Sequence, residues 1–494
     1  MNRIALALAG IAGLAVQPAT AVQLSRSGAG QVLIFPYFIA RPSASAADGE
    51  SNTLISIVNT KPQFKAVKVR VLESRNAREL RDINVFLGPW DIWTTAIIPT
   101  ATGARLVTND NTCVTPRNMF SEPGLDSFTN ASYSGVFADG DPFGAGSTTL
   151  DRTREGYIEV IEMGVVTTPQ TQAFIKHGTN GIPANCAALD ALDPGIGTGG
   201  TSFPTGLSAP SGGLNGRATI INSALGINFT YTATALDNWS DSVRYGAAGS
   251  GQPRLGAASP PVSTIVLPNG DTLRQTWASG RDAVSAVLMR SAVNNEFILD
   301  AGTASQTDWI ITFPTKRDYI GIAAGATAPI PQAPFSSNFG GFGACDETIA
   351  GSEGYQGFNR EGVPLLAAPT SLRLCWVSNI IPFFSNISLL RATAVAPHTN
   401  AMQTALAGAT TQGGPATSVP GGVQGGNGRM TLRFGTAAQR MTPISSTLNN
   451  APTANTTLVG MPFISLGVHN YRRSGVISNY GGVIAPVYEQ AFVK

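Results

Sequence analysis

Apolar and polar residues alternate strictly along parts of the N-terminal third of the chain. Val67, Val69 and Val71 alternate with Lys68 and Arg70. Because successive side chains of an extended strand point to opposite faces, this period of two predicts a half-buried β-strand at residues 65–71. Comparable runs predict further strands at residues 31–38, 52–58, 82–87 and 91–98. Short strands at this spacing favour a two-sheet sandwich of immunoglobulin type.

Strand patterns recur along the rest of the chain. Runs at residues 156–163, 217–222 and 228–233 are expected to complete the first sandwich. In the second half, strands are predicted at residues 263–267, 308–313, 371–377, 430–434, 461–466 and 480–484. Residues 282–297 have helical spacing instead, with Val284, Val287 and Leu288 on one face and Asp282 placed to cap the start.

These patterns predict a mainly β protein with two immunoglobulin-like β-sandwich domains, long Gly-rich loops and one short helix in the second half. We expect a first domain at residues 22–245, a linker at 246–261 and a second domain at 262–494. The 55 glycines and 32 prolines exceed average usage, which is consistent with long loops. The alternative is an outer-membrane barrel, but Gly-rich stretches such as residues 405–428 interrupt the regular strand period that a barrel requires.

The first 21 residues have the composition of a cleavable export signal peptide. Arg3 supplies one positive charge before an apolar run at residues 4–16, and Ala19-Thr20-Ala21 provides the small residues that a signal peptidase reads. We therefore expect the mature chain to begin near Val22. Its expected location is the cell surface or the extracellular space, with the periplasm as a further location. No later apolar run reaches the ~20 residues of a membrane-spanning helix.

Charge is sparse and balanced in this chain. Removal of the signal takes away Arg3 and no acid, which leaves 31 of the 32 basic residues against 30 acidic residues. Charged residues make up 13% of the chain, about half the usual share. This balance offers no basic patch to nucleic acid or anionic lipid. We therefore expect partners among envelope components or other surface proteins.

Four cysteines follow the expected signal: Cys113, Cys186, Cys345 and Cys375. An even number in an exported chain favours two disulfides, although four cysteines permit three pairings. We favour Cys113–Cys186 and Cys345–Cys375, because each pair then stays within one expected domain. A metal site is the alternative, but the chain has no closely spaced Cys/His pair.

Sequence signatures of catalysis are sparse. His177, His398 and His469 are scattered along the chain, and neither a zinc-protease motif nor a G-x-S-x-G elbow occurs. Residues 195–200 match the letters of G-x-G-x-x-G, but they lie in a polar loop rather than between a strand and a helix. A flexible loop is therefore expected there, and no cofactor is predicted.

Acidic residues offer two weak alternatives. Glu155 and Glu159 on one strand would be about 13 Å apart, beyond the spacing of paired glycosidase carboxylates. The sequence leaves open whether carboxylates from separate strands converge into a catalytic pair. Asp139 and Asp141 are candidate calcium ligands in a Gly-rich turn, but an Asx-type turn is the favoured role because the EF-hand spacing is missing.

A family resemblance is carried by segments in both halves of the chain. The run Gly-Gln-Val-Leu-Ile-Phe-Pro-Tyr-Phe at residues 30–38 is joined by residues 53–59, 65–70, 282–289, 295–300, 307–317, 374–376 and 479–482. These segments resemble exported proteobacterial proteins that are poorly characterised and loosely labelled cell-surface proteins. The resemblance implies an extracytoplasmic location, and it supplies no catalytic residues.

Two sets of side chains are candidates for contact with a partner. Lys316 and Arg317 follow a predicted strand and are expected at its exposed end, as a contact loop or a plain turn with solvated charges. Trp90 and Trp93 have an odd separation, so a strand would place one in the core and leave the other exposed.

These observations favour an exported, non-catalytic protein with a structural, adhesive or binding role. The alternative is a secreted hydrolase of polysaccharide or peptide whose site forms only when distant residues converge. A pocket with converging Asp and Glu side chains would favour the hydrolase.

Overall fold

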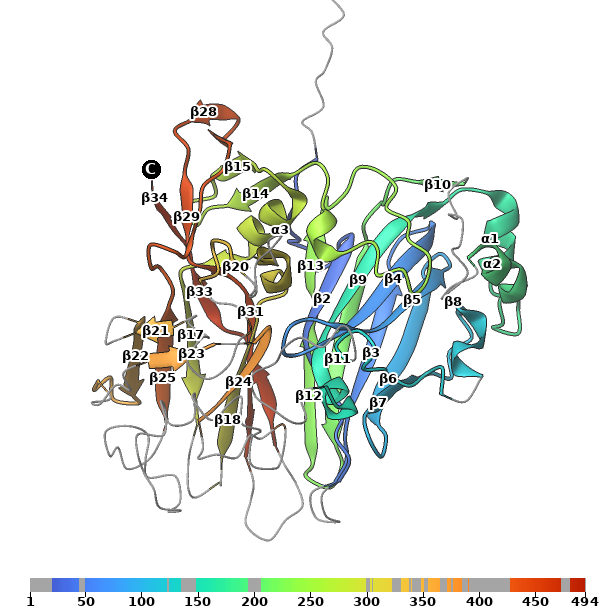
Figure 1. Cartoon of the computed structure of the whole chain (residues 1–494), viewed down its shortest axis with the longest axis horizontal. Helices are drawn as coiled ribbons and strands as arrows, with labels where there is room; N and C mark the ends of the chain where they lie inside the picture. Colours follow the sequence, from blue (N-terminus) through green and yellow to red (C-terminus); the bar gives the residue numbers. More distant parts are fainter. Residues whose placement is uncertain are drawn as a thin grey trace, which may run out of the picture.

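The chain folds into a series of antiparallel β-sheets, seen side by side in Figure 1. The computed structural model describes residues 20–43, 49–121, 124–134, 148–193, 206–298, 303, 305–321, 330–336, 339, 348–350, 354–364, 371–374, 376–383, 390, 427–471 and 480–493. Every ladder between the described strands is antiparallel. The prediction of a mainly β protein is confirmed.

The N-terminal half, residues 20–245, contains two large sheets. The first has eight strands in the order β1-β13-β2-β9-β4-β5-β8, with β10 added beside β9. Their bounds are β1 Gln23–Leu24, β13 Thr234–Asp237, β2 Val32–Ile39, β9 Glu155–Val166, β4 Phe64–Glu73, β5 Glu79–Leu87, β8 Cys113–Thr115 and β10 Leu207–Ser208. The second has five strands: β12 Ile227–Thr232, β11 Leu214–Asn222, β3 Ser51–Asn59, β6 Ile92–Pro99 and β7 Ala104–Val107, in that order.

The two large sheets face each other across one apolar layer. Val67, Val69 and Val71 on β4 share a buried cluster with Ile57 on β3 and Trp93 on β6. Each of these positions alternates with an outward-facing residue, so the period of two in the sequence sets which face is apolar. The arrangement is a β-sandwich, and all five strands predicted in the N-terminal third are present.

The outer face of the eight-stranded sheet is also buried, contrary to the half-buried strand expected at residues 65–71. Lys68 is 0% exposed and Arg70 is 5% exposed. The segment that follows β13 covers this face: Lys68 Nζ donates to the carbonyl of Ala247 at 2.8 Å and to Asp82 Oδ1 at 2.5 Å. A polar strand face therefore meets protein instead of water, and its charges are paired.

Pro36 lies inside strand β2. The pairing of β2 with β9 shifts register between Phe35 and Phe38, which is the bulge that a proline without an N–H donor produces. A proline within a strand is confined to an edge strand or a bulge. The structure contains the bulge, with β2 between β13 and β9.

The C-terminal half, residues 262–493, is divided among smaller sheets. Two four-stranded sheets carry most of its core: β22-β25-β17-β33 and β24-β18-β31-β32. Their bounds are β22 Tyr355–Asn359, β25 Gly428–Arg433, β17 Ala292–Phe297, β33 Val487–Glu489, β24 Ser378–Pro382, β18 Gln306–Thr312, β31 Ile464–Asn470 and β32 Gly482–Ile484.

The remaining strands of this half form one four-stranded sheet and several shorter ones. The four-stranded sheet is β14 Val262–Val266, β15 Thr272–Thr276, β27 Ser445–Leu448 and β28 Ala451–Thr453. The shorter sheets pair β16 Met289–Arg290 with β30 Met461–Pro462, β19 Ile320–Gly321 with β20 Ile330–Pro331, β21 Thr348–Ala350 with β23 Ser371–Arg373, and join β26 Arg440–Met441, β29 Thr457–Val459 and β34 Ala491–Val493.

The helix predicted at residues 282–297 is shorter than expected. Helix α3, Gly280–Leu288, ends before Met289, and residues 289–297 form β16 and β17 instead. Asn295 pairs with Met430 across the β17–β25 ladder, while Val293 and Phe297 enter the core. Pairing with strands more than a hundred residues away therefore overrides the local helical spacing.

Two short helices and a disulfide close one end of the sandwich. Helices α1, Pro169–Ile175, and α2, Cys186–Leu192, lie at the right edge of Figure 1. Cys186 at the start of α2 is bonded to Cys113 on β8, 73 residues earlier. This is one of the two disulfides expected from the sequence.

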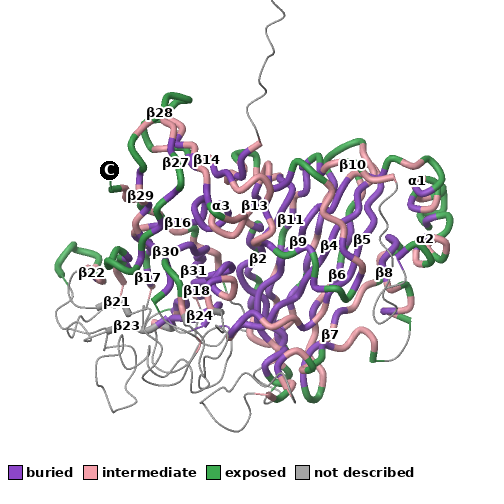
Figure 2. Tube along the Cα trace, turned by 45° about the horizontal axis from the view of Figure 1, so that its top comes forward, coloured by how far each residue is buried: buried purple, intermediate pink, exposed green. Residues whose placement is uncertain are grey.

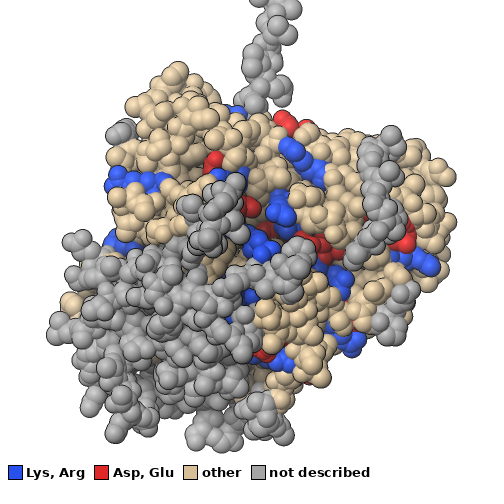
Figure 3. Space-filling view, viewed as in Figure 1, with Lys and Arg blue, Asp and Glu red and all other residues tan. Residues whose placement is uncertain are grey.

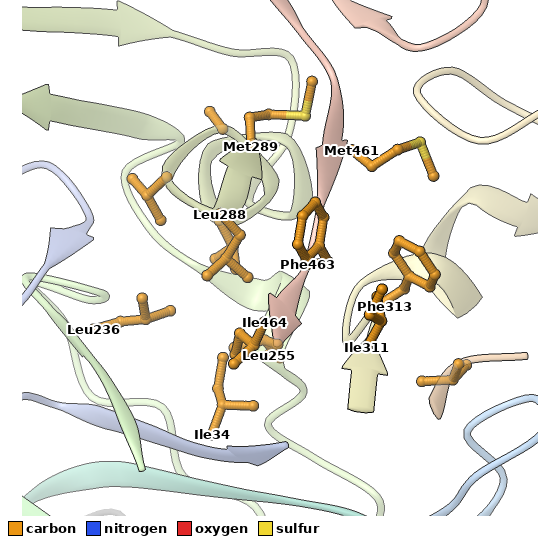
Figure 4. Packing of buried hydrophobic residues seen from close by; sticks show 14 of the residues in the cluster. Ile34, Leu236, Leu255, Leu288, Met289, Ile311, Phe313, Met461, Phe463 and Ile464 are labelled. Carbon is orange, nitrogen blue, oxygen red and sulfur yellow. The ribbon is translucent and has the colours of Figure 1, made fainter. Parts of the chain in front are cut away.

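The two halves share their apolar interior. Figure 4 shows Ile34 and Leu236 from the N-terminal sandwich beside Leu288 of α3 and Phe463 of the C-terminal half. In Figure 2 buried segments continue from one half into the other. The expected linker, residues 246–261, contributes Leu255 to the same cluster. No helix in the described ranges is both long and apolar enough to cross a lipid bilayer.

Candidate functional site

A polar cavity of about 270 Å³ lies between the outer face of the eight-stranded sheet and two segments that follow it in the chain. Strands β4, β5 and β9 form its floor, and residues 249–255 and 314–318 form its walls. Its charged lining consists of Arg70, Arg78, Glu79, Glu159, Arg254, Arg317 and Asp318. Four guanidinium groups and three carboxylates therefore face one small volume.

The register of the sheet brings Arg70 and Glu159 together. They stand directly opposite each other on β4 and β9, and Arg70 Nη1 donates to Glu159 Oε2 at 2.5 Å. The Nε and Nη2 atoms of Arg70 both donate to Glu79 Oε2, at 3.1 and 3.0 Å. Burial alone would lower the pKa of Arg70, but the carboxylates of Glu159 and Glu79 outweigh burial and raise it.

Glu159 is held on both of its oxygens. Tyr157 donates its hydroxyl to Glu159 Oε1 at 3.3 Å and lies at the same distance from the carbonyl of Pro314. Burial raises the pKa of Glu159, and the Arg70 guanidinium opposes that rise. Since Glu159 is 2% exposed, its carboxylate acts mainly on the residues around it.

Asp318 differs from the other two carboxylates of the cavity in its ion pairing. It belongs to the 3-10 helix Lys316–Tyr319. Among the described residues, its carboxylate takes part in no salt bridge within 4.0 Å, whereas Glu79 and Glu159 are both paired to Arg70. Burial raises the pKa of Asp318, and the guanidinium groups of four arginines oppose the rise: Arg70, Arg254, Arg281 and Arg317.

Gly256 leaves space for the Asp318 side chain. A Cβ atom at residue 256 would lie 2.4 Å from Asp318 Oδ2 and 3.0 Å from the Cβ of Arg281. Any larger residue there would push the carboxylate away from its position. The segment 249–256 therefore builds one wall of the cavity and also fixes the place of the Asp318 carboxylate.

The two residues of the expected contact loop, Lys316 and Arg317, lie in different surroundings. Lys316 is 0% exposed, with its ammonium 5.5–6.0 Å from the ring centres of Phe313, Phe335 and Phe339. Such a position over aromatic faces is favourable for a cation, but it removes Lys316 from solvent. Arg317 lines the cavity and donates to the carbonyl of Asn76 at 2.8 Å.

Other sequence candidates lie elsewhere. Trp93 is 0% exposed and Trp90 is 65% exposed, as the odd separation predicted. Trp90 also has a positive φ of 61°, which is unusual for a bulky residue and is found at turns or strained sites. Several candidates lie outside the described residues, namely Cys345, Cys375, Asp139, Asp141 and His398. Within the described ranges, no group of three His, Cys, Asp or Glu side chains is arranged to hold a metal ion.

Most residues of the cavity were not identified from the sequence. Arg70 was recognised only as a polar position on a strand, and Glu159 only as a carboxylate too far from Glu155 for a glycosidase pair. Asp318 and Arg254 carry no motif. The useful signals were the charges on strand faces and the position of residues 315–319 directly after a strand. Sequence alone does not show that β4, β9 and residues 249–256 meet at one place.

Charged groups gather on one face of the molecule. In Figure 3, red and blue atoms lie next to each other near the middle of the face, and the surrounding described surface is mostly uncharged. Charged residues make up only 13% of the chain. In comparisons with known proteins, no protein family, no curated protein and no solved structure matches the chain.

Proposed function

We propose that this chain is an exported, non-catalytic binding protein of the cell surface or extracellular space, and that the polar cavity recognises an acidic sugar unit of an envelope polysaccharide. The observation that carries the proposal is the Asp318 carboxylate, which has no salt bridge to a described residue and lines a cavity whose other charges are mostly guanidinium groups. The signal-like N-terminus and the resemblance to exported proteins support the location.

The composition of the cavity suggests the chemistry of the ligand. Arginine guanidinium groups bind carboxylates with paired N–H donors, and Arg254 is placed on the wall for this role. Asp318 accepts hydrogen bonds from sugar hydroxyls, and Ser132 and Ser250 add hydroxyl groups to the lining. A ligand with one acidic group and several hydroxyls, such as a uronic acid, matches this set.

The size of the cavity favours a small unit. Its volume of about 270 Å³ lies at the lower end of the range for small-molecule sites. A single sugar of a longer chain fits this limit better than a complete oligosaccharide. The rest of the polymer would extend over the surface of the protein, which suits an adhesive or structural role.

The state of the carboxylates favours binding over hydrolysis. Glycosidases generally use two carboxyl groups, one of which gives or takes a proton at the substrate. Glu159 and Glu79 are both occupied by Arg70, and Glu159 is almost fully buried. Asp318 is then left as the cavity carboxylate with no salt bridge to a described residue, which suits a hydrogen-bond acceptor for a ligand.

The test is binding of galacturonate and glucuronate oligosaccharides, measured by isothermal titration calorimetry against neutral oligosaccharides of the same length. We expect the wild-type protein to bind galacturonate or glucuronate oligosaccharides more tightly than the neutral ones. The substitutions Asp318→Asn and Arg254→Gln should each weaken this binding by roughly tenfold or more. Asp126→Asn, at a surface ion pair with Arg105, serves as the control. Equal binding of neutral and acidic oligosaccharides would contradict the proposal.

The second candidate is a secreted hydrolase, and one observation favours it. Glu159 and Asp318 come from separate elements and converge on one cavity, and burial raises the pKa of each. Hydrolysis would be established if the wild type released reducing ends from the same oligosaccharides and if this release were lost in both Asp318→Asn and Glu159→Gln. Binding without release in the wild type would favour the first candidate.

We also propose an immunoglobulin-like character for the sandwich and a location held by interactions with envelope components. The support for the first is the pair of antiparallel sheets around one core. Fractionation of cells that produce the chain tests the second. Recovery of the protein in the cytoplasm would contradict it.

A further inference from the structure

A second cavity, larger and more apolar, lies between residues 23–26 of the N-terminal half and the C-terminal half. Its volume is about 690 Å³, within the range of small-molecule sites. Leu24 at the end of β1, Ile265 and Val266 on β14, and Val287 on α3 supply apolar walls. It shares no lining residue with the polar cavity.

A buried cation, Arg290, lines this cavity. Arg290 is 8% exposed, and no salt bridge joins it to a carboxylate of the described residues. Its two hydrogen bonds, at 3.1 and 2.6 Å to the carbonyls of Val287 and Met289, both use Nη1. The ring of Tyr488 lies 5.2 Å from the guanidinium carbon.

Neighbouring charges do not neutralise Arg290. Glu489, the acidic residue of the lining, pairs with Arg433 at 3.1 Å. Arg26 adds a second positive charge at the cavity. Burial lowers the pKa of Arg290, which shows that the protein provides little compensation for its charge. Burying a guanidinium with unused N–H donors costs free energy of folding unless an anion pairs with its charge and accepts hydrogen bonds from these donors.

Apolar walls and one uncompensated cation define a complementary ligand. We propose that this cavity binds an amphipathic carboxylate, an acyl chain of fatty-acid type whose carboxylate pairs with Arg290 and whose chain lies against Leu24, Ile265 and Val287. The two guanidinium nitrogens not bonded to backbone, Nε and Nη2, provide the paired donors that a carboxylate accepts.

The test is titration of the full chain with decanoate, followed by calorimetry, with decan-1-ol and acetate as ligands that keep only the chain or only the charge. We expect one decanoate to bind per protein. Decan-1-ol and acetate should bind the wild type at least about tenfold more weakly than decanoate does, and the Arg290→Gln variant should bind decanoate at least about tenfold more weakly than the wild type does. Arg440→Gln, an exposed arginine of the same half, should bind like the wild type.

A second variant covers the case in which Arg290→Gln does not fold. Val266 is 38% exposed at the cavity, so Val266→Trp fills space there without disturbing the interior. Loss of decanoate binding in folded Val266→Trp supports the site. Unchanged decanoate affinity in either folded variant, or no binding to the wild type, overturns it. An apolar peptide with a free C-terminal carboxylate that binds when decanoate does not would overturn the acyl-chain assignment.

Discussion

At the scale of single residues, the feature that recurs is the buried charge with a defined partner. Glu73 at the end of β4 is 0% exposed, and its carboxylate accepts from the backbone N–H groups of Arg75, Asn76 and Arg78 at 2.8–3.0 Å. Arg152 adds an ion pair at 3.1 Å. One carboxylate thus fixes the turn between β4 and β5.

Glu73→Gln should therefore destabilise the fold. Burial alone would raise the pKa of Glu73, but Arg152 and the backbone donors outweigh it and lower the pKa below 4.5. Because the folded-state pKa is depressed, the stabilisation is present above about pH 4.5 and is lost as the pH falls through the folded value. We expect a loss of about 3 kcal/mol at pH 7 that narrows in acid, measured by urea unfolding at several pH values.

The control for this prediction is Glu361→Gln, at a fully exposed position paired with Arg360. Its stability should match that of the wild type. A Glu73→Gln variant as stable as the control at pH 7 would show that the turn does not depend on the carboxylate.

Asp318 should behave in the opposite way. Burial raises its pKa, so the ionised carboxylate costs stability at neutral pH. This cost shrinks as the pH falls through the raised pKa of the folded state, and it is absent below the unfolded value of 3.8. Asp318→Asn is expected to match or exceed the wild-type Tm at pH 7 while losing the proposed ligand. A clear drop in Tm, measured by circular dichroism, would assign Asp318 a structural role instead.

At the scale of elements, short helices depend on contacts from outside. Helices α1 and α2 have seven residues each, too few to be stable alone in water. The Cys113–Cys186 disulfide ties α2 to β8, and Leu189 of α2 packs with Phe86 and Met163 of the sheet.

The double variant Cys113→Ser, Cys186→Ser should lose about 2–5 kcal/mol, measured by guanidinium unfolding. The loss of stability should be local. Amide hydrogen exchange should therefore accelerate more in α1 and α2 than in β3 and β11 of the second sheet. Uniformly faster exchange over the sandwich would argue against a local role for the bond.

The sequence predicted elements well where the information is local. Strands β3, β4 and β6 show a period of two that needs no partner to be recognised. Residues 289–297 were assigned to a helix as the continuation of the apolar face formed by Val284, Val287 and Leu288. Their strand conformation comes from β25 and β33, which are distant in sequence, and no local signal shows this.

At the scale of the whole molecule, the interior is continuous. Ile310 on β18 belongs to the same buried cluster as Ile57 and Val69 of the N-terminal sandwich. Trp309, its neighbour, points into the other large cluster with Ile34. One strand of the C-terminal half therefore contacts both apolar layers.

Ile310→Ala should cost about 2–5 kcal/mol and should affect both halves. We expect hydrogen exchange, measured by mass spectrometry, to be faster in β2 and β3 as well as in β18 and β31. The matched control is Ile444→Ala, a 63% exposed isoleucine of the C-terminal half, which should change little. Faster exchange confined to β18 and β31 would show that the halves are energetically independent.

The cavity also belongs to this scale, which explains why the sequence did not reveal it. Alternation along β4 and β9 identifies a polar face but does not show whether water or another segment covers it. Arg70, Glu159, Arg254 and Asp318 meet only after residues 249–256 and 314–318 have packed on the sheet. Their convergence is a property of chain topology.

Two other buried ion pairs of the eight-stranded sheet have a consequence for the stability of the protein at high salt concentration. Lys65 with Glu162 and Lys68 with Asp82 are enclosed at 2.6 and 2.5 Å with 0% side-chain exposure, beyond the reach of dissolved counterions. Mobile ions weaken attraction between solvent-exposed charges over roughly 8 Å at physiological ionic strength, but they screen enclosed pairs far less. The fold should therefore be nearly indifferent to sodium chloride, whereas capture of a charged ligand at the open mouth of the polar cavity should weaken steadily as salt is added.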